Sequence, residues 1–315
     1  MSDFKRGQRA KQPNHIPLRG WWDIAKRIIK QMSRDNLSLV AAGVAFYALL
    51  AIFPAIAALV SVYAYFASPN DISAYLSQFM ALLPQSTQDI ILSQVSNLAQ
   101  KSQTSLSLSA LGTLLLTIWS SSKGSQALIT ACNISYQEYE KRSFFKAQLV
   151  RLLFSVGAIV VAVIALVIIG ILPLALNLLG IKESIDFLIM LISWPLLALT
   201  FNFALLILYR YAPHRKAAKW RWVTVGSFTA TVLWIVASFG FSFYVSHFAS
   251  YNETYGSLGG VVIMLMWLFI SAYIIILGAT INAALEQQTA QDSTVGPDKK
   301  RGQRGAYVAD HLDTK

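Results

Sequence analysis

Cysteine, histidine and acidic residues are scarce in this chain of 315 residues. It has one cysteine, Cys132, which excludes a disulfide within the chain. None of the four histidines lies at metal-ligand spacing from another histidine or from the cysteine. These histidines are His15, His214, His247 and His311. The sequence therefore predicts no disulfide, no metal site and no cofactor.

Charged residues are also few, at 13% of the chain, whereas hydrophobic residues make up 55% and the mean hydropathy is +0.52. This composition is typical of multi-pass membrane proteins. The segment 41–66 (AAGVAFYALLAIFPAIAALVSVYAYF) contains no Asp, Glu, Lys, Arg or His. At about 1.5 Å per residue such a helix exceeds the roughly 30 Å thickness of the hydrocarbon core of a bilayer. The segment is therefore predicted to be a transmembrane helix.

Five further apolar segments predict an all-α, polytopic membrane protein with six transmembrane helices, since backbone groups in lipid must be hydrogen-bonded internally. The second of the six is unusual, because a polar run at 120–126 separates an apolar stretch at 106–119 from another at 127–132. Only together are these two stretches long enough to span. The predicted spans are 41–66, 106–132, 152–179, 186–209, 222–248 and 257–285.

Outside the spans, the sequence predicts a basic arm with an amphipathic helix over 1–36, the transmembrane domain over 37–287 and a disordered tail over 288–315. A short amphipathic helix is also expected on the opposite face, within 67–105. In the helix at 20–34, Trp21 and Trp22 oppose Lys26 and Lys30. This pattern favours either an interfacial helix with its lysines toward anionic headgroups or a helix packed on the bundle.

Lys and Arg are distributed asymmetrically among the loops. The N-terminal arm has nine, the loops after spans two and four have four and five, and the tail has five of the 26 in the chain. The other loops contain only Lys101 and Lys182. By the positive-inside rule both termini are predicted to be cytoplasmic. The positive charge is thus explained by topology, and no nucleic-acid partner is predicted.

Four segments occur together in a characteristic order: Asp35-Asn36 with AAGVAFYALLAIFP, then IWSSSKGSQALITACNISY, RYAPHRKAAKWRW, and SYNETYGSLGG with MWLFISAYIIILGATINAALE. Over residues 20–287 the chain resembles the YihY/BrkB family of bacterial inner-membrane proteins. The resemblance implies a six-helix inner-membrane protein of transport type. Members were long labelled ribonuclease BN, a tRNA-processing enzyme, and export of lipid or lipopolysaccharide precursors has been proposed for some of them.

The ribonuclease alternative needs clustered carboxylates or histidines that hold a metal ion or act as acid and base. Glu138 and Glu140 are the only close pair among the candidates, and on a helix their spacing places them on different faces. His214 lies far away in the sequence. We therefore predict that the protein is not an enzyme. A scaffold without either activity is the third alternative, and the sequence does not distinguish a homo-oligomer from a complex with an envelope-assembly protein.

The candidate substrate-binding residues centre on Lys123 within the second span, because a charge at this depth usually faces a cavity. Its neighbours Ser120, Ser121, Ser122 and Gly124 are typical of a discontinuous helix that exposes backbone groups to a substrate. Alternatively, Lys123 extends to the membrane surface and the small residues allow close helix packing.

Four more polar residues complete the candidate site: Asn133, Tyr255, Asn282 and Glu286. Asn133, Asn282 and Glu286 are expected near the cytoplasmic ends of spans two and six, either as binding residues or as links between helices. Glu286 is expected to pair with a basic loop residue, or with Lys123. Tyr255 lies in a predicted turn on the outer side, next to a Gly-x-x-x-Gly motif.

Overall fold

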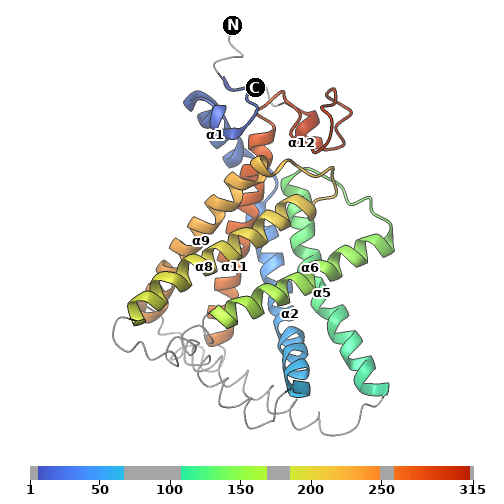
Figure 1. Cartoon of the computed structure of the whole chain (residues 1–315), viewed down its shortest axis with the longest axis vertical. Coiled ribbons are helices and arrows are strands. Elements are labelled where there is room, and N and C mark those ends of the chain that lie inside the picture. The colour runs from blue at the N-terminus through green and yellow to red at the C-terminus, as the bar shows by residue number, and fades with distance from the viewer. Residues whose placement is uncertain (1–5, 67–107, 169–184, 249–258, 313–315) are drawn as a thin grey trace.

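The structure is a computed structural model that describes residues 6–66, 108–168, 185–248 and 259–312 (Figure 1). In these ranges every regular element is a helix, which confirms the predicted all-α class. The elements are η2 (Pro13–His15), α1 (Leu18–Arg34), α2 (Leu37–Phe66), α5 (Leu108–Ser135), α6 (Phe144–Leu166), α8 (Ile185–Tyr211), α9 (Trp220–Phe248), α11 (Gly259–Glu286) and α12 (Tyr307–Asp310).

Several of these helices are long and apolar enough to cross a membrane. Four stretches of the described residues meet this condition, and α1 with the first part of α2 gives a fifth if this bent pair is one broken span. The chain is thus a multi-pass membrane protein. The count of six and the orientation stay predictions. The four stretches are Phe144–Ala165, Ile192–Tyr211, Trp220–Ser246 and Gly259–Glu286.

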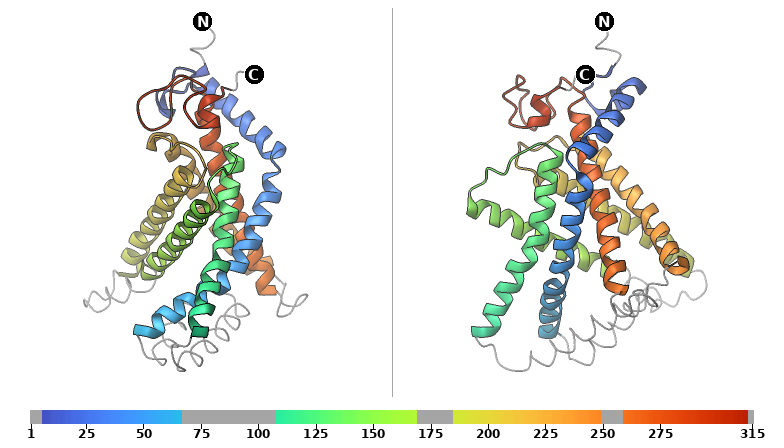
Figure 2. Two further views of the ribbon diagram at one scale, coloured as in Figure 1. Left: turned by 90° about the vertical axis from the view of Figure 1, so that its right-hand side faces the viewer. Right: turned by 180° about the vertical axis from the view of Figure 1, so that it is seen from behind.

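Both chain ends lie at the same end of the bundle, which we call the terminal end (Figure 1). α2, α5, α9 and α11 come together toward that end and spread toward the opposite end, whereas α6 crosses the bundle obliquely (Figure 2). α11 lies at the centre of the packing, with α9 and α2 as its main neighbours. Its last eight residues, 279–286, are all buried. The tightest part of the core therefore lies close to the terminal end.

Two glycines bring α9 and α11 into backbone contact. A Cβ atom placed on Gly226 would lie 2.1 Å from the carbonyl oxygen of Gly278, and one on Gly278 would lie 2.8 Å from the carbonyl oxygen of Gly226. No side chain fits at such distances, so only glycine allows this approach. The close contact holds the terminal halves of the two helices in a fixed register.

α1 and α2 meet at a bend of 64°. Asn36 sits in the bend with a φ of 47°, a left-handed conformation that asparagine adopts more readily than most residues. Its carbonyl accepts hydrogen bonds from the amides of Leu39 and Val40, at 2.9 and 3.1 Å, and so begins α2. The bend lays α1 across the terminal end of the bundle.

α1 has two different faces. Ile24, Arg27 and Gln31 are buried on the side that packs on α11. Leu18 and Trp22, on the opposite side, are 88% and 64% exposed. α1 therefore packs on the bundle and also presents an apolar stripe outward, so the two alternatives drawn from the sequence are compatible.

The tail is folded over residues 287–312, where the sequence predicts disorder. Ser293 and Thr294 are buried, and the Lys219 amide donates a hydrogen bond to the Ser293 carbonyl. Arg304 donates to the carbonyls of Ala290, Gln291 and Ala309 at 2.7 to 3.1 Å. Few tail residues are apolar, so its composition gave no sign of folding; buried hydrogen bonds hold it in place.

Candidate functional site

The predicted break in the second span is absent, because α5 runs without interruption from Leu108 to Ser135. Gly124 packs against α2, and a Cβ placed on it would lie 3.2 Å from the Cβ of Ala51. Ser122 is buried, whereas Lys123 is exposed on the surface of α5. The discontinuous-helix prediction was therefore wrong, and Lys123 does not face an enclosed space.

Small residues along this part of α5 serve helix packing. The hydroxyl of Ser125 lies 2.9 Å from that of Ser155 on α6, in a buried hydrogen bond. Together with Gly124 against α2, this places close contacts on two sides of α5. The side chains of Ser120 and Ser121, and all of Tyr255, lie outside the described residues.

Asn282 links α11 to α9 next to the glycine contact. Its Oδ1 accepts a hydrogen bond from the Gly226 amide at 2.8 Å, and its Nδ2 donates to the Val223 carbonyl at 3.1 Å. Asn282 is fully buried. The interpretation of this amide as a link between helices agrees with the structure.

Glu286 pairs with a basic loop residue, as expected. Arg215, in the loop after α8, donates to both carboxylate oxygens at 3.1 and 2.6 Å. The carboxylate also accepts from the Ser293 hydroxyl of the tail, and the Arg215 guanidinium lies 4.8 Å from the centre of the Tyr136 ring. The sequence offered Lys123 as a second possible partner of Glu286, but Glu286 forms its ion pair with Arg215.

Asn133 fixes the same loop from the end of α5. Its Oδ1 accepts a hydrogen bond from the His214 amide at 2.7 Å, and its Nδ2 donates to Glu140 at 3.3 Å. Glu138 accepts a bond from the Tyr307 amide at 2.6 Å. Burial raises the pKa of the Glu138 carboxyl, although this bond and the nearby positive charge of Arg215 act in the opposite direction. These polar residues connect α5, the loop after α8 and the tail.

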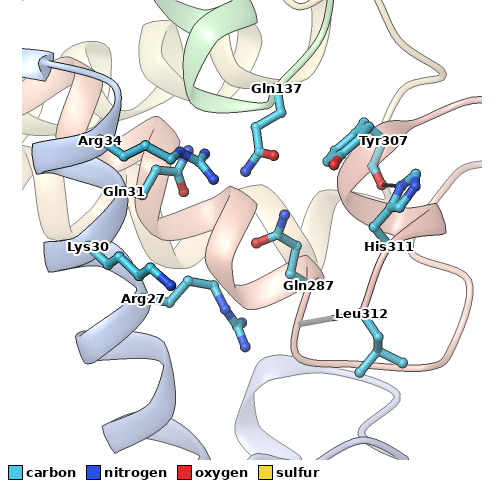
Figure 3. Close-up of a pocket in the computed structure, with 9 residues that line it drawn as sticks. All are labelled: Arg27, Lys30, Gln31, Arg34, Gln137, Gln287, Tyr307, His311 and Leu312. Atoms are coloured by element: carbon cyan, nitrogen blue, oxygen red, sulfur yellow. Dashed lines mark hydrogen bonds between the residues drawn. The ribbon is translucent and has the colours of Figure 1, made fainter. Parts of the chain in front are cut away.

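A pocket of about 340 Å³ opens beside this network at the terminal end (Figure 3). Four of its residues, Arg27, Lys30, Gln31 and Arg34, come from one face of α1 at i, i+3, i+4, i+7 spacing. The other residues come from the end of α5, from the end of α11 and from the tail. They are Gln137, Gln287, Tyr307, His311 and Leu312.

The pocket is cationic and rich in amides. Its lining contains three Lys or Arg side chains and three glutamines, and no Asp or Glu is among these nine described residues. Arg27 donates to the Ala284 carbonyl at 2.8 Å, which holds its guanidinium group in place. Arg34 forms an ion pair with Asp35 at 2.8 Å, which orients its guanidinium group and offsets part of its charge. Arginine in a fixed orientation and lysine are the side chains that bind phosphate and carboxylate groups.

Metal binding finds no support in the part of the chain that the structure describes. Within it, no three His, Cys, Asp or Glu side chains gather closely enough to hold an ion. The Cys132 side chain is buried in α5.

A known family has the same sequence pattern over most of this chain. The profile of the family described as "Virulence factor BrkB" matches residues 28–303. The chain belongs to the BrkB family. No solved structure matches the chain.

Relatives of this BrkB-family chain include the ribonuclease-like protein YfkH of Bacillus subtilis, 30% identical over 254 residues, which cover 78% of this chain and 89% of YfkH. A UPF0761 membrane protein of Tolumonas auensis is 36% identical over 81 residues, or 26% of each chain. Another, of Pseudoalteromonas atlantica, is 34% identical over 83 residues, or 26% of this chain and 27% of the relative.

The name of YfkH raises the ribonuclease alternative again. In this BrkB-family chain Glu138, Glu140 and His214 lie near one another, and each of them has structural partners. Glu138 accepts from Tyr307, and Glu140 forms an ion pair with Arg142 at 3.2 Å. The His214 ring nitrogen Nδ1 lies 3.2 Å from the Lys141 amide. All three hold the loops of the terminal end together.

The pocket was not predicted from the sequence. The pattern of the helix at 20–34 placed Lys30 on its charged face, and the glutamines carried no signal by themselves. The spacing of 27, 30, 31 and 34 on one face of α1 was the only available indication. The other wall could not be anticipated, because it depends on the tail being folded.

Proposed function

We propose that this protein is a bacterial inner-membrane export factor that takes up an anionic lipid or lipid-linked envelope precursor from the cytoplasmic side. The observation that carries this proposal is the cationic pocket between α1 and the end of α11, at the terminal end of the bundle. An anionic headgroup at the membrane surface is the ligand that suits its charge.

The orientation in this proposal rests on charge. Lys and Arg are concentrated in the N-terminal arm, the tail and the loops that meet them at the terminal end. The positive-inside rule assigns these segments to the cytoplasm. Reporter fusions at Lys146, at His214 and at the C-terminus are expected to report a cytoplasmic location, and a fusion at Asn252 a periplasmic one. A cytoplasmic signal at Asn252 would contradict the six-span topology.

Transport is tested with the purified chain in vesicles that contain fluorescently labelled phosphatidylglycerol. The expected result is movement of the label between leaflets, measured by chemical bleaching from outside, with and without an imposed proton gradient. The double variant Lys30→Gln, Arg34→Gln should lower the rate. Lys26→Gln, next to the pocket residues on α1 but outside the lining, is the control.

The same preparation distinguishes the alternatives. Cleavage of tRNA that is lost in Glu138→Gln and in His214→Ala would overturn the proposal in favour of a ribonuclease. Neither lipid movement nor cleavage, with an intact fold, would favour a scaffold.

A further inference from the structure

The two sides of the pocket present different chemistry. α1 supplies the cations of Arg27, Lys30 and Arg34. The amide groups of Gln137 and Gln287 point into the pocket from the other elements (Figure 3). A simple anion would accept hydrogen bonds from the cations and from the amide NH₂ groups, which leaves the amide oxygens without a donor. The amides therefore fit a ligand that also carries hydrogen-bond donors.

The Gln31 amide has a fixed orientation and an acceptor atom without a partner. Its Nε2 donates to the Ser135 carbonyl at 2.8 Å, which fixes the orientation of the amide, since only the NH₂ group can donate to a carbonyl. Its Oε1 is buried and has no hydrogen-bond partner. An unsatisfied buried acceptor costs about 1–3 kcal/mol. The oxygen is buried behind the pocket surface, so it accepts a hydrogen bond from a ligand hydroxyl once the side chains that cover it shift on binding.

Gln137 ends α5 and supplies a second amide to the pocket. It has a φ of 56°, in the left-handed region, where a residue with a Cβ atom is disfavoured. Glycine is the usual residue at such a helix end. Its side chain lines the pocket.

From these observations we infer that the pocket binds a phosphorylated polyol, with the phosphate held by the cations of α1 and a hydroxyl donated to Gln31 Oε1. The volume of about 340 Å³ is near the lower end of the range of small-molecule sites, and it suits a glycerol phosphate or sugar phosphate group. This inference rests on the proposed function and names its substrate class.

The position of α1 explains how a lipid headgroup reaches the site. Leu18, Trp22 and Ile29 form the exposed apolar stripe opposite the packed face of α1. Such a stripe inserts at the boundary between headgroups and acyl chains. The pocket then lies at headgroup depth, and the acyl chains stay in the bilayer.

The test measures binding to the full chain in detergent, without transport. The probes are short-chain phosphatidylglycerol and phosphatidylmethanol, which have the same charge but differ in hydroxyl groups, and soluble glycerol phosphate. The wild type is expected to bind phosphatidylglycerol at least about fivefold more tightly than phosphatidylmethanol. This ratio of affinities corresponds to roughly one additional hydrogen bond. Equal affinity for the two lipids would overturn the inference.

Variants assign the contacts. Lys30→Gln with Arg34→Gln should weaken both lipids, whereas the control Lys26→Gln should weaken neither. Gln31→Met should remove only the preference for phosphatidylglycerol. Should this variant not fold, Gln287→Met provides the same comparison at another amide. Unchanged binding in the double variant would overturn the assignment of the phosphate site.

The remaining outcomes separate the claims. Glycerol phosphate that binds as tightly as the lipid supports the chemistry and identifies a soluble source; weaker binding identifies the lipid. Binding with the expected preference but without lipid movement in vesicles rejects the export proposal and keeps the site. Lipid movement without a preference for phosphatidylglycerol rejects the polyol site and keeps the export proposal.

Discussion

Arg215 and Glu286 form an ion pair whose side chains are 2% and 0% exposed, with 2.6 Å between Nη2 and Oε2. The Glu286 carboxylate also accepts a hydrogen bond from Ser293. One buried group therefore joins the end of α11, the loop after α8 and the tail. Two of these elements, the end of α11 and the tail, also supply residues to the pocket wall.

Glu286→Gln is expected to destabilise the fold by about 3–5 kcal/mol, because it leaves the Arg215 charge buried without its partner. Thermal unfolding in detergent measures the change. Asp298→Asn is the control, since Asp298 pairs with Lys219 at 3.0 Å but is 74% exposed. That variant should lose at most about 1 kcal/mol. Similar losses in the two variants would contradict the structural role of the buried pair.

Removal of both charges gives a further check. Arg215→Met combined with Glu286→Met should be more stable than Glu286→Gln alone, because no unpaired buried charge remains. A double variant as unstable as the single one would show that the hydrogen bonds of the network matter more than its charges.

Gly278→Ala should prevent normal assembly of α9 and α11. The added Cβ atom would lie 2.4 Å from the Tyr209 hydroxyl and 2.8 Å from the Gly226 carbonyl. Gly240→Ala, in α9, is the control because nothing lies within 4 Å of the added atom. It should keep or raise stability, by up to about 1 kcal/mol, since alanine favours helix. Yield and monodispersity after purification distinguish the two outcomes.

The tail is expected to detach at acid pH. The Asp292 carboxylate accepts hydrogen bonds from the amides of Thr294 and Lys299, at 2.8 and 2.9 Å. Burial opposes the charged form, but these bonds and the hydroxyl of Thr294 outweigh it and lower the pKa of Asp292 below its usual range. The carboxylate therefore stabilises the folded tail above its ordinary pKa, and this contribution is lost as the pH falls through the lowered value.

Pepsin cleavage within 287–312, followed by mass spectrometry, measures this detachment. The wild type should become sensitive only toward the acid end of the range. Asp292→Asn should be equally sensitive at every pH at which pepsin is active. A wild type with the flat profile of the variant would show that Asp292 does not hold the tail.

The long apolar helices were predictable because hydropathy indicates which segments can lie in lipid. α8 and α9 begin and end within two residues of the predicted bounds. The pairing of Glu286 with a basic loop residue was predictable as well, because a carboxylate near a membrane surface needs a cation. The two alternatives for Lys123 stayed open, since a sequence shows depth along a helix but not which face turns outward.

The pocket and the folded tail depend on contacts between residues far apart in the chain. Gln31 meets Ser135, and Glu138 meets Tyr307. Glutamine at a helix surface is usually solvated, so neither Gln31 nor Gln137 stood out. Only the arrangement of α1, α11 and the tail around one space gives these amides a role.

Gln137→Gly separates stability from binding at the pocket. α5 ends with the Gln137 amide bonded to the Ile134 carbonyl and the Glu138 amide bonded to the Asn133 carbonyl, the Schellman arrangement that favours glycine at this position. The substitution removes the Cβ atom from a left-handed residue, so the free energy of unfolding should rise by about 1 kcal/mol. It also removes an amide from the pocket, so the preference for phosphatidylglycerol over phosphatidylmethanol should fall. Gln137→Ala, which loses the amide but keeps the Cβ atom, should show the lower preference without the gain in stability. A glycine variant that is more stable and keeps the full preference would remove Gln137 from the site.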